Sequence, residues 1–294
     1  MRIFVTGATG FVGSAVIHKL IEVGHSVRAL ARSDIAAGNF SAMGVEIVRG
    51  SLDDHDRLHA ASRACDAVIH TAFDHDFSRF NESCAQDQKA IRVMGDALKG
   101  SARPLIVTSG LAYIAPGRTA LESDTPIVNP AYPRVSDRTA QELATEGVNS
   151  MVVRLPPSVH GQGDHGFVPR LIATARATGV SAYIGDGENL WPAVHRRDAA
   201  LLYQLALTKG QAGDRFHASA EAGIPFREIA TAIGRGLGIP ISSLDEAQAV
   251  AHFSWLANFV GMDARASSDF TRARLGWLPT EPGLIADMED AGYF

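Results

Sequence analysis

Three glycines near the N-terminus constrain this chain more than any other feature. Gly7, Gly10 and Gly13 follow a short apolar run at residues 3–5 and precede an apolar pattern of helical spacing at residues 12–20. The run predicts a buried strand, and the later pattern predicts a helix. A strand, a glycine-rich turn and a helix N-terminus form a binding site for a pyrophosphate, because the amides of the first turn and the helix dipole face the anion. The sequence therefore predicts a dinucleotide-binding turn.

Each glycine of this turn has its own predicted role. Gly7 permits the tight turn, Gly10 leaves no Cβ to obstruct the phosphate, and Gly13 lets the helix approach the strand. A glycine triplet alone is a weak signal, but the strand before it and the helix after it are the context that the motif requires. The residues expected to contact the cofactor in this turn are Gly7, Thr9, Gly10, Phe11, Val12 and Gly13.

Strand and helix patterns alternate from the N-terminus to about residue 155. Alternation of this kind predicts a parallel sheet with right-handed crossovers and helices on both faces, which is a doubly wound α/β fold of the Rossmann type. After Pro156 and Pro157 the alternation stops. The candidate strands are 2–6, 26–30, 45–48, 66–70, 104–108 and 150–154, and the candidate helices are 11–23, 35–42, 53–62, 84–99, 134–147, 167–179, 197–208, 225–236 and 244–258.

The spacing GxxGxxG resembles that of the extended and atypical short-chain dehydrogenase/reductases, the NAD-dependent epimerase/dehydratase group. Six further segments resemble this family in the same order, so the resemblance covers nearly the whole chain. They are residues 50–54, 68–72, 107–110, 153–157, 194–200 and 275–279. The resemblance implies a dinucleotide-binding Rossmann domain at 1–155, onto which 193–217 packs back, and a smaller substrate-binding lobe built from 156–192 and 218–294.

The cofactor is expected to be NADP. Enzymes that choose NAD usually carry Asp or Glu about 20 residues past the glycines, where it accepts from the ribose 2′-hydroxyl. Arg32 stands near this position, 19 residues after Gly13, and Arg28 lies just before it. A guanidinium here can pair with a 2′-phosphate and stack on the adenine. NAD stays open as the alternative, because Asp34 follows and both arginines are also consistent with solvated surface residues.

The resemblance also implies cofactor contacts on the segments that follow other strands. Ser51, Leu52 and Asp53 would flank the adenine, and Thr71, Ala72 and Phe73 would line the path from the pyrophosphate to the nicotinamide ribose. Ser33 and Pro156 complete the expected set.

The catalytic pattern of the family is missing. Most members carry a Tyr and a Lys four residues apart on the helix after the fifth strand, where the Lys lowers the pKa of the Tyr. Alignment of the matching stretch puts Pro133 at the Tyr position and Asp137 at the Lys position. A shift of register does not restore the pair, because none of the four lysines, Lys19, Lys89, Lys99 and Lys209, follows a tyrosine by four residues.

Two tyrosines are candidate replacements for the proton donor. Tyr113 lies shortly after the fifth strand and is the preferred candidate, with Tyr132 as the second. Thr108 and Ser109 offer hydroxyls near the position of the family's Ser or Thr, although Gly110 is an alternative match for that position.

Several other polar and aromatic residues are candidates for the site. Arg134 and Arg138 are expected to form an ion-pair network with Asp137, or else to anchor an acidic substrate. The loop at 160–166 contains two histidines and one carboxylate, but it lacks the third or fourth spaced ligand that a zinc site requires, so no metal is expected. The candidate substrate contacts are His165, Phe167 and Trp191; Trp255 and Trp277 are expected in the core, and His195 and Asp198 at the cap of the helix near 197.

Composition limits the partners. The 294 residues carry a net charge of −5 without a basic face, which argues against nucleic acid. No apolar stretch approaches the ~20 residues that span a bilayer, and the first strand begins too early for a signal peptide. With Cys65 and Cys84 expected as free thiols, a cytoplasmic location is predicted. A homodimer through the helices at 84–99 and 134–147 is also expected; the apolar residues Ile91, Met94 and Leu98 fit such a face, and equally fit packing on the sheet.

The sequence thus predicts an NADP-dependent oxidoreductase that acts on a small carbonyl, alcohol or sugar-like substrate. One alternative is an epimerase or dehydratase that reuses the bound cofactor. Another is a non-catalytic NADP(H) sensor, because the Tyr–Lys pair is absent and a fold does not imply a function.

Overall fold

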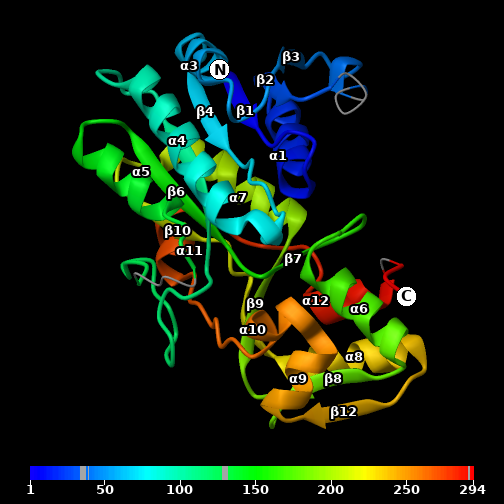
Figure 1. Cartoon of the computed structure of the whole chain (residues 1–294). Coiled ribbons are helices and arrows are strands. Elements are labelled where there is room, and N and C mark those ends of the chain that lie inside the picture. Colours follow the sequence, from blue (N-terminus) through cyan, green and yellow to red (C-terminus); the bar gives the residue numbers. More distant parts are fainter. Residues whose placement is uncertain (34–37, 39, 128–131, 291) are drawn as a thin grey trace.

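A parallel sheet of seven strands forms the centre of the computed structural model, which describes residues 1–33, 38, 40–127, 132–290 and 292–294 (Figure 1). Its order is β10-β6-β5-β4-β1-β2-β3, and every neighbouring pair is parallel. The strands are β1 Arg2–Thr6, β2 Ser26–Ala31, β3 Glu46–Arg49, β4 Ala67–His70, β5 Leu105–Gly110, β6 Ser150–Leu155 and β10 Arg215–His217. The predicted Rossmann-type α/β fold is confirmed.

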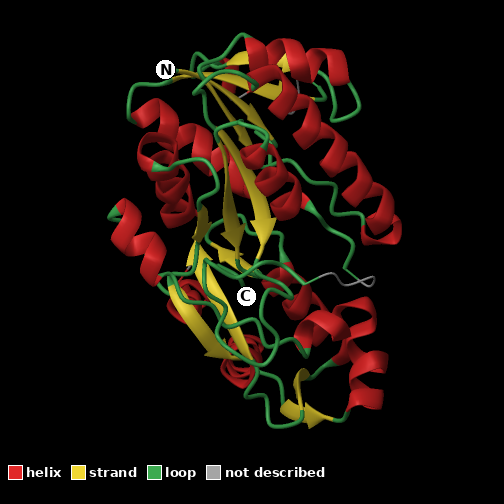
Figure 2. Cartoon of the chain, turned by 90° about the vertical axis from the view of Figure 1, so that its left-hand side faces the viewer, coloured by secondary structure: helices red, strands yellow, loops and turns green. Residues whose placement is uncertain are grey.

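Helices cover both faces of this sheet, as Figure 2 shows. Side chains alternate between the two faces along each strand. Ile3 and Val5 therefore belong to one apolar cluster with α1 and α7, whereas Phe4 belongs to the other, with α3, α4 and α5. The bounds are α1 Phe11–Glu22, α3 His55–Arg63, α4 Phe80–Leu98, α5 Ser136–Thr145 and α7 Arg196–Lys209.

The remaining elements build a second body with its own apolar cluster, which includes Leu171, Trp191 and Phe226. Its strands are β7 Ser158–His160, β9 Leu190–His195 and β11 Glu221–Pro225 in one small sheet, and β8 Ser181–Ile184 and β12 Ile241–Leu244 in another. Its helices are α6 Phe167–Thr178, α8 Phe226–Leu237, α9 Glu246–Phe253, α10 Ala257–Val260 and α12 Leu284–Asp290. By contrast, Trp277 and the end of α11, Asp269–Leu275, pack in the cluster against α7.

Two expectations about these elements were wrong. The predicted helix at 244–258 is divided: α9 begins at a capping box of Asp245 and Gln248 and ends at Ser254, whose φ of 53° leaves the helical region. A short 3₁₀ turn (η2, Ser254–Leu256) and α10 follow. The six strands after β6 were not predicted, because they lack a clear alternation of apolar and polar residues. The helix expected at 35–42 lies largely outside the described residues.

The apolar residues proposed for a dimer face are buried inside the chain. Ile91, Met94 and Leu98 have no exposed surface, because they lie on the face of α4 that packs in the core. The outer side of α4 and α5 carries ion pairs instead, from Arg92 to Glu142 and Glu146. The homodimer therefore stays a prediction that these three residues do not support. Among the described residues, no helix combines the length and the apolarity needed to cross a membrane.

Candidate active site

The glycine turn closes the crevice where the strand order reverses. β1 pairs with β2 on one side and with β4 on the other, and dinucleotides bind at such a reversal, outside the carboxyl ends of the strands. Gly7 has a φ of 71°, and a Cβ on it would lie 2.5 Å from the amide of Ala72. A Cβ on Gly13 would lie 2.0 Å from the Gly7 carbonyl oxygen. The turn is thus a cradle that only glycine can line, as a pyrophosphate site requires.

Arg32 and Arg28 differ in position. Arg32 is exposed just past the carboxyl end of β2 and has no ion-pair partner among the residues that the structure describes. Arg28 lies further back on β2, where its Nη2 is 2.7 Å from Oε1 of Glu46. Arg28 is therefore occupied away from the crevice, and Arg32 remains as the candidate for a 2′-phosphate. Asp34, the residue that kept NAD open, lies outside the described residues.

The other residues predicted to contact a cofactor lie on both sides of the turn. Thr9 is exposed, and Phe11 and Val12 open α1. Thr71 donates from Oγ1 to the Thr6 carbonyl at 2.7 Å and so supports the turn from behind. Asp53 is exposed and accepts from Gln86 Nε2 at 2.7 Å. Of the remainder, Ser33 and Ser51 are half-buried, Leu52 and Pro156 are buried, and Phe73 is half-buried.

Two side chains from later in the chain reach the glycine turn, one at the start of α7 and one in the loop before α6. The Arg196 guanidinium lies 4.5 Å from the centre of the Phe11 ring and donates to Oγ of Ser14 at 2.8 Å. The ring of His165, a predicted substrate contact, is 5.7 Å from that of Phe11 in an edge-to-face arrangement. The start of α1 is therefore covered from outside by an arginine and a histidine.

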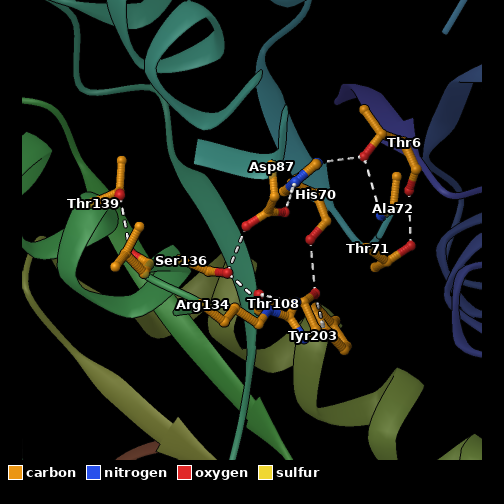
Figure 3. Close-up of polar contacts among 11 residues, drawn as sticks. Thr6, His70, Thr71, Ala72, Asp87, Thr108, Arg134, Ser136, Thr139 and Tyr203 are labelled. Carbon is orange, nitrogen blue, oxygen red and sulfur yellow. Dashed lines mark hydrogen bonds and ion pairs between the residues drawn. The ribbon is translucent and has the colours of Figure 1, made fainter. Parts of the chain in front are cut away.

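A chain of buried hydrogen bonds runs from β1 across β4 to the start of α5 (Figure 3). His70 contacts Thr6 Oγ1 through Nδ1 at 2.7 Å and Asp87 Oδ1 through Nε2 at 3.0 Å. The Ser136 hydroxyl donates to the other Asp87 oxygen at 2.6 Å and accepts from Nε of Arg134 at 2.9 Å. Burial raises the pKa of Asp87, but the bonds from His70 and Ser136 and the charge of Arg134 outweigh it, so the pKa lies below its usual range. Asp87 is thus held as a carboxylate.

Thr108 is tied into the same region by its hydroxyl. Oγ1 donates to the His70 carbonyl at 2.7 Å and lies 2.6 Å from the hydroxyl of Tyr203 on α7. Both neighbours and Thr108 itself are buried. The Thr108 hydroxyl thus donates to the backbone, and its catalytic role stays a prediction. Ser109 is also buried, with 7% of its surface exposed.

Asp137 does not face the crevice. It is buried and accepts from Nε of Arg154 at 2.6 Å and from Nε of Arg215 at 3.3 Å. Arg134, which was expected to pair with it, bonds Ser136 and the Thr108 carbonyl instead. Arg138 is exposed on α5. The residue at the family's Lys position is therefore part of a structural ion pair between α5, β6 and β10.

Two tyrosine rings meet at the carboxyl end of β5. Tyr113 and Tyr132 have ring centres 5.3 Å apart, and both are half-buried. A Cβ on Gly110 would lie 3.3 Å from the Tyr132 hydroxyl, so that hydroxyl fills space beside Gly110. Burial raises the pKa of Tyr132, and the charge and hydrogen bonding of Arg134 act in the opposite direction. Tyr113 has a φ of 58°, which is uncommon for a non-glycine residue.

Comparison with known proteins agrees with this geometry. Residues 3–219 match the model of the NAD dependent epimerase/dehydratase family. The chain belongs to this family. An uncharacterized protein of Schizosaccharomyces pombe is 46% identical over all of both chains. The 4-hydroxy-2-methyl-3-oxo-4-farnesyl-3,4-dihydroquinoline-1-oxide ketoreductase of Stigmatella aurantiaca is 28% identical and covers 81% of this chain and 74% of its own.

Solved structures of the epimerase/dehydratase fold superpose along the whole chain. A dTDP-glucose 4,6-dehydratase from Streptomyces venezuelae, solved with NAD and DAU bound, has a TM-score of 0.78 over 100% of this chain and 96% of its own, at 22% identity. The similarity confirms the fold, and the family to which the chain belongs is NAD(P)-dependent.

The rings of Phe77, Trp255 and Phe259 form an aromatic wall between the second body and the segment after β4. The Phe77 and Trp255 rings stack at 4.7 Å, and the Phe167 and Phe259 rings are 4.9 Å apart. Phe77 lies in η1 (Phe77–Arg79), in the segment between β4 and α4, so this wall joins the two bodies. Trp255 is 39% exposed, which corrects its expected place in the core, and Trp277 is buried as predicted.

Trp191, predicted as a substrate contact, is a core residue. It has no exposed surface, and its ring packs 4.9 Å from that of Phe226 and 5.9 Å from that of Phe167. The residue lies on β9, and its side chain points into the second body. Phe167 is half-buried between this core and the aromatic wall.

Several site residues were missed from the sequence. Asp87 lies on the apolar face of α4, four residues before the buried Ile91, and a carboxylate in such a position predicts a buried partner. That signal was available. Arg196 carried no local signal, because its contact with Phe11 depends on how α7 packs against α1. His195 accepts from the amide of Arg197 and caps α7 as expected.

Proposed function

We propose that this protein is an NADPH-dependent reductase of small carbonyl compounds. The observation that carries the proposal is the juxtaposition of the glycine cradle, which has no room for a Cβ at Gly7 or Gly13, with the two tyrosines at the end of β5. The ketoreductase relative supports a reduction in preference to an epimerisation.

Two features fit a bound dinucleotide: the glycine turn and the positive charge of Arg32. The turn at Gly7, Thr9, Gly10, Phe11, Val12 and Gly13 would hold the pyrophosphate, and Arg32 with Ser33 would meet the 2′-phosphate. Ser51, Leu52 and Asp53 would flank the adenine, and Thr71, Ala72, Phe73 and Pro156 the nicotinamide ribose. When bound, the reduced nicotinamide supplies a hydride to the carbonyl carbon.

The proton would come from Tyr113 or Tyr132, with Ser109 as a neighbouring hydroxyl. Both rings lie at the end of β5, where a carbonyl in contact with the nicotinamide would also lie. His165 and Phe167, on the smaller lobe proposed at 156–192 and 218–294, would contact the rest of the substrate. The aromatic wall of Phe77, Trp255 and Phe259 favours a substrate with an apolar face.

Binding and turnover test this function in two steps. NADPH and NADH are titrated by quenching of protein fluorescence, and NADPH oxidation is then followed at 340 nm with aldehydes, aryl and alkyl ketones, and nucleotide sugars. Tight NADPH binding with turnover of carbonyls is expected. Binding without consumption of NADPH by any member of the panel would instead identify a sensor. Isomerisation of a nucleotide sugar with no net oxidation would identify an epimerase.

A further inference from the structure

The Tyr132 hydroxyl occupies a space that a side chain at position 110 would otherwise fill. Gly110 ends β5, and its missing Cβ would lie 3.3 Å from that hydroxyl. Gly110 is also the alternative match for the family's Ser or Thr. The hydroxyl at this point of the site is therefore provided by a different residue, from the segment before α5.

Arg134 follows Tyr132 by two residues, and its charge and hydrogen bonding act to lower the pKa of that phenol, which burial raises. Its guanidinium lies 4.1 Å from the centre of the Phe73 ring and donates from Nη2 to the Thr108 carbonyl at 3.2 Å. These two contacts hold the guanidinium between β5 and the segment that follows β4. A guanidinium keeps its charge at every pH at which a tyrosine titrates. Arg134 therefore presents a permanent positive charge to the phenol.

Asp87 and Ser136 hold Arg134 in this position. The Ser136 hydroxyl accepts a hydrogen bond from Nε of Arg134 and donates one to Asp87, whose other oxygen is bonded by His70 (Figure 3). Because Asp87 is 1% exposed, its charge is satisfied only inside this network. Arg134 is thus anchored through Ser136 to a buried carboxylate.

Tyr113 lies beside Tyr132 in a different setting. Among the residues that the structure describes, its hydroxyl has no hydrogen-bond partner, and its ring packs on that of Tyr132. The hydroxyl beside Gly110 is that of Tyr132, and Arg134 acts on the ionisation of this phenol.

We infer that Tyr132 is the proton donor of the reaction and that Arg134 takes the role of the missing lysine, with Asp87 and Ser136 as its positioning residues. The inference rests on the proposed carbonyl reduction. In that reaction the carbonyl carbon accepts a hydride from the reduced nicotinamide, and the carbonyl oxygen takes the proton as the O–H bond of Tyr132 breaks. The products are the alcohol and the oxidised cofactor, and the phenolate, stabilised by Arg134, recovers a proton from water.

Kinetic variants separate the two tyrosines. Tyr132→Phe should lower kcat/KM about 100-fold or more, the scale of a lost general acid, with little change in NADPH affinity. Tyr113→Phe should lower it less than about 10-fold, and Tyr183→Phe, on β8, serves as the control for a tyrosine outside the site. The assignment is overturned if Tyr113→Phe loses activity and Tyr132→Phe keeps it.

A titration without cofactor or substrate tests the pairing by itself. The tyrosinate absorbance of the wild type minus that of Tyr132→Phe reports the ionisation of Tyr132. Arg134→Gln should raise the midpoint of the Tyr132 titration by about one pH unit, because the positive charge is lost. Arg134→Lys should return the midpoint towards the wild-type value, as long as the pH is low enough for the lysine to keep its charge. Asp87→Asn and Ser136→Ala should shift the midpoint in the same direction by less. An unmoved midpoint in Arg134→Gln overturns the pairing, even if carbonyls are reduced.

The two tests fail in distinguishable ways. A normal Arg134-dependent midpoint with no turnover of any carbonyl would overturn the proposed reduction, and the donor assignment with it, but would leave the coupled pair established. Turnover with an unmoved midpoint would keep the reductase and remove Arg134 from its mechanism.

Discussion

Two helix beginnings lie at the same edge of the sheet and use opposite chemistry. At the start of α1 the chain presents backbone: Gly10 caps the helix with no side-chain hydrogen bond, and Gly7 and Gly13 leave no room for a Cβ. At the start of α5 it presents side chains, where Arg134 and Ser136 are held by a carboxylate from α4.

The difference shows which part of such a site tolerates change. A pyrophosphate cradle requires the backbone to come close to the phosphates, so its tight positions admit only glycine. Its sequence pattern is therefore kept. A proton donor needs a hydroxyl and a cation at given points in space, and any element that reaches those points can supply them. The start of α5 therefore departs from the family pattern, while the start of α1 follows it.

The glycine turn at the start of α1 should tolerate substitution less well than the start of α5. Gly13→Ala should lower cofactor affinity more than about 100-fold and destabilise the fold by about 3 kcal/mol or more, because the new Cβ would lie 2.0 Å from the Gly7 carbonyl. Calorimetric binding and urea denaturation measure both effects. Gly10→Ala is the matched control: its Cβ would approach only the Gly7 carbonyl, at 3.1 Å, so affinity should fall while stability is nearly kept. Equal stability losses in the two variants would contradict this account.

The residue at the family's Lys position should matter for stability alone. Asp137→Asn should cost about 3 kcal/mol of unfolding free energy, because Arg154 would be left as a buried, partly unpaired charge. Asp96→Asn, at an exposed position of α4, should change stability by less than about 0.5 kcal/mol. If Asp137→Asn instead altered the pH profile of turnover without a loss of stability, Asp137 would act in the reaction together with the residues at the start of α5.

Arg32, at the expected adenosine end of the cofactor site, is a side chain that would distinguish NADPH from NADH. Arg32→Ala should remove most of an NADPH preference of about 1.5–3 kcal/mol and leave NADH affinity nearly unchanged. Arg28→Ala should not affect the ratio, because Arg28 is paired with Glu46. Fluorescence titrations at moderate salt give the four affinities. Equal affinities of the unmodified protein for NADPH and NADH would refute the role of Arg32.

The buried network behind α5 should make stability depend on pH. Burial and the charge of Arg154 lower the pKa of His217 to about 3, because its Nε2 accepts from Arg154 at 3.0 Å. In the unfolded chain the pKa is near 6.5, so below that pH only the unfolded state gains a proton, and stability falls as the pH drops from about 6.5 towards 3. The loss between pH 7 and pH 5 should be about 2 kcal/mol.

Urea denaturation at the two pH values measures this loss. His217→Gln should show a smaller loss than the wild type, since glutamine does not titrate. The same slope in both proteins would assign the pH dependence to other groups.

The order of strands and helices through β6 followed from apolar runs that alternate with apolar residues at helical spacing. The strands after β6 carried no such pattern. Ser254, with its positive φ, divided a helix that apolar spacing alone had joined. At the site, the glycine turn was readable, whereas the burial of Trp191 and the contact of Thr108 with Tyr203 depend on neighbours far away in the sequence.

The sequence by itself determined the glycine turn and the parallel sheet, because backbone conformation and helix or strand period are local properties of the chain. Only the tertiary structure decided what Asp87, Arg134 and Asp137 do. Their charges are buried, and a buried charge takes the role of whichever partner the packed elements bring to it. For Asp137 that partner is Arg154 on β6; for Arg134 it is a serine tied to a carboxylate of α4, next to a phenol at the end of β5.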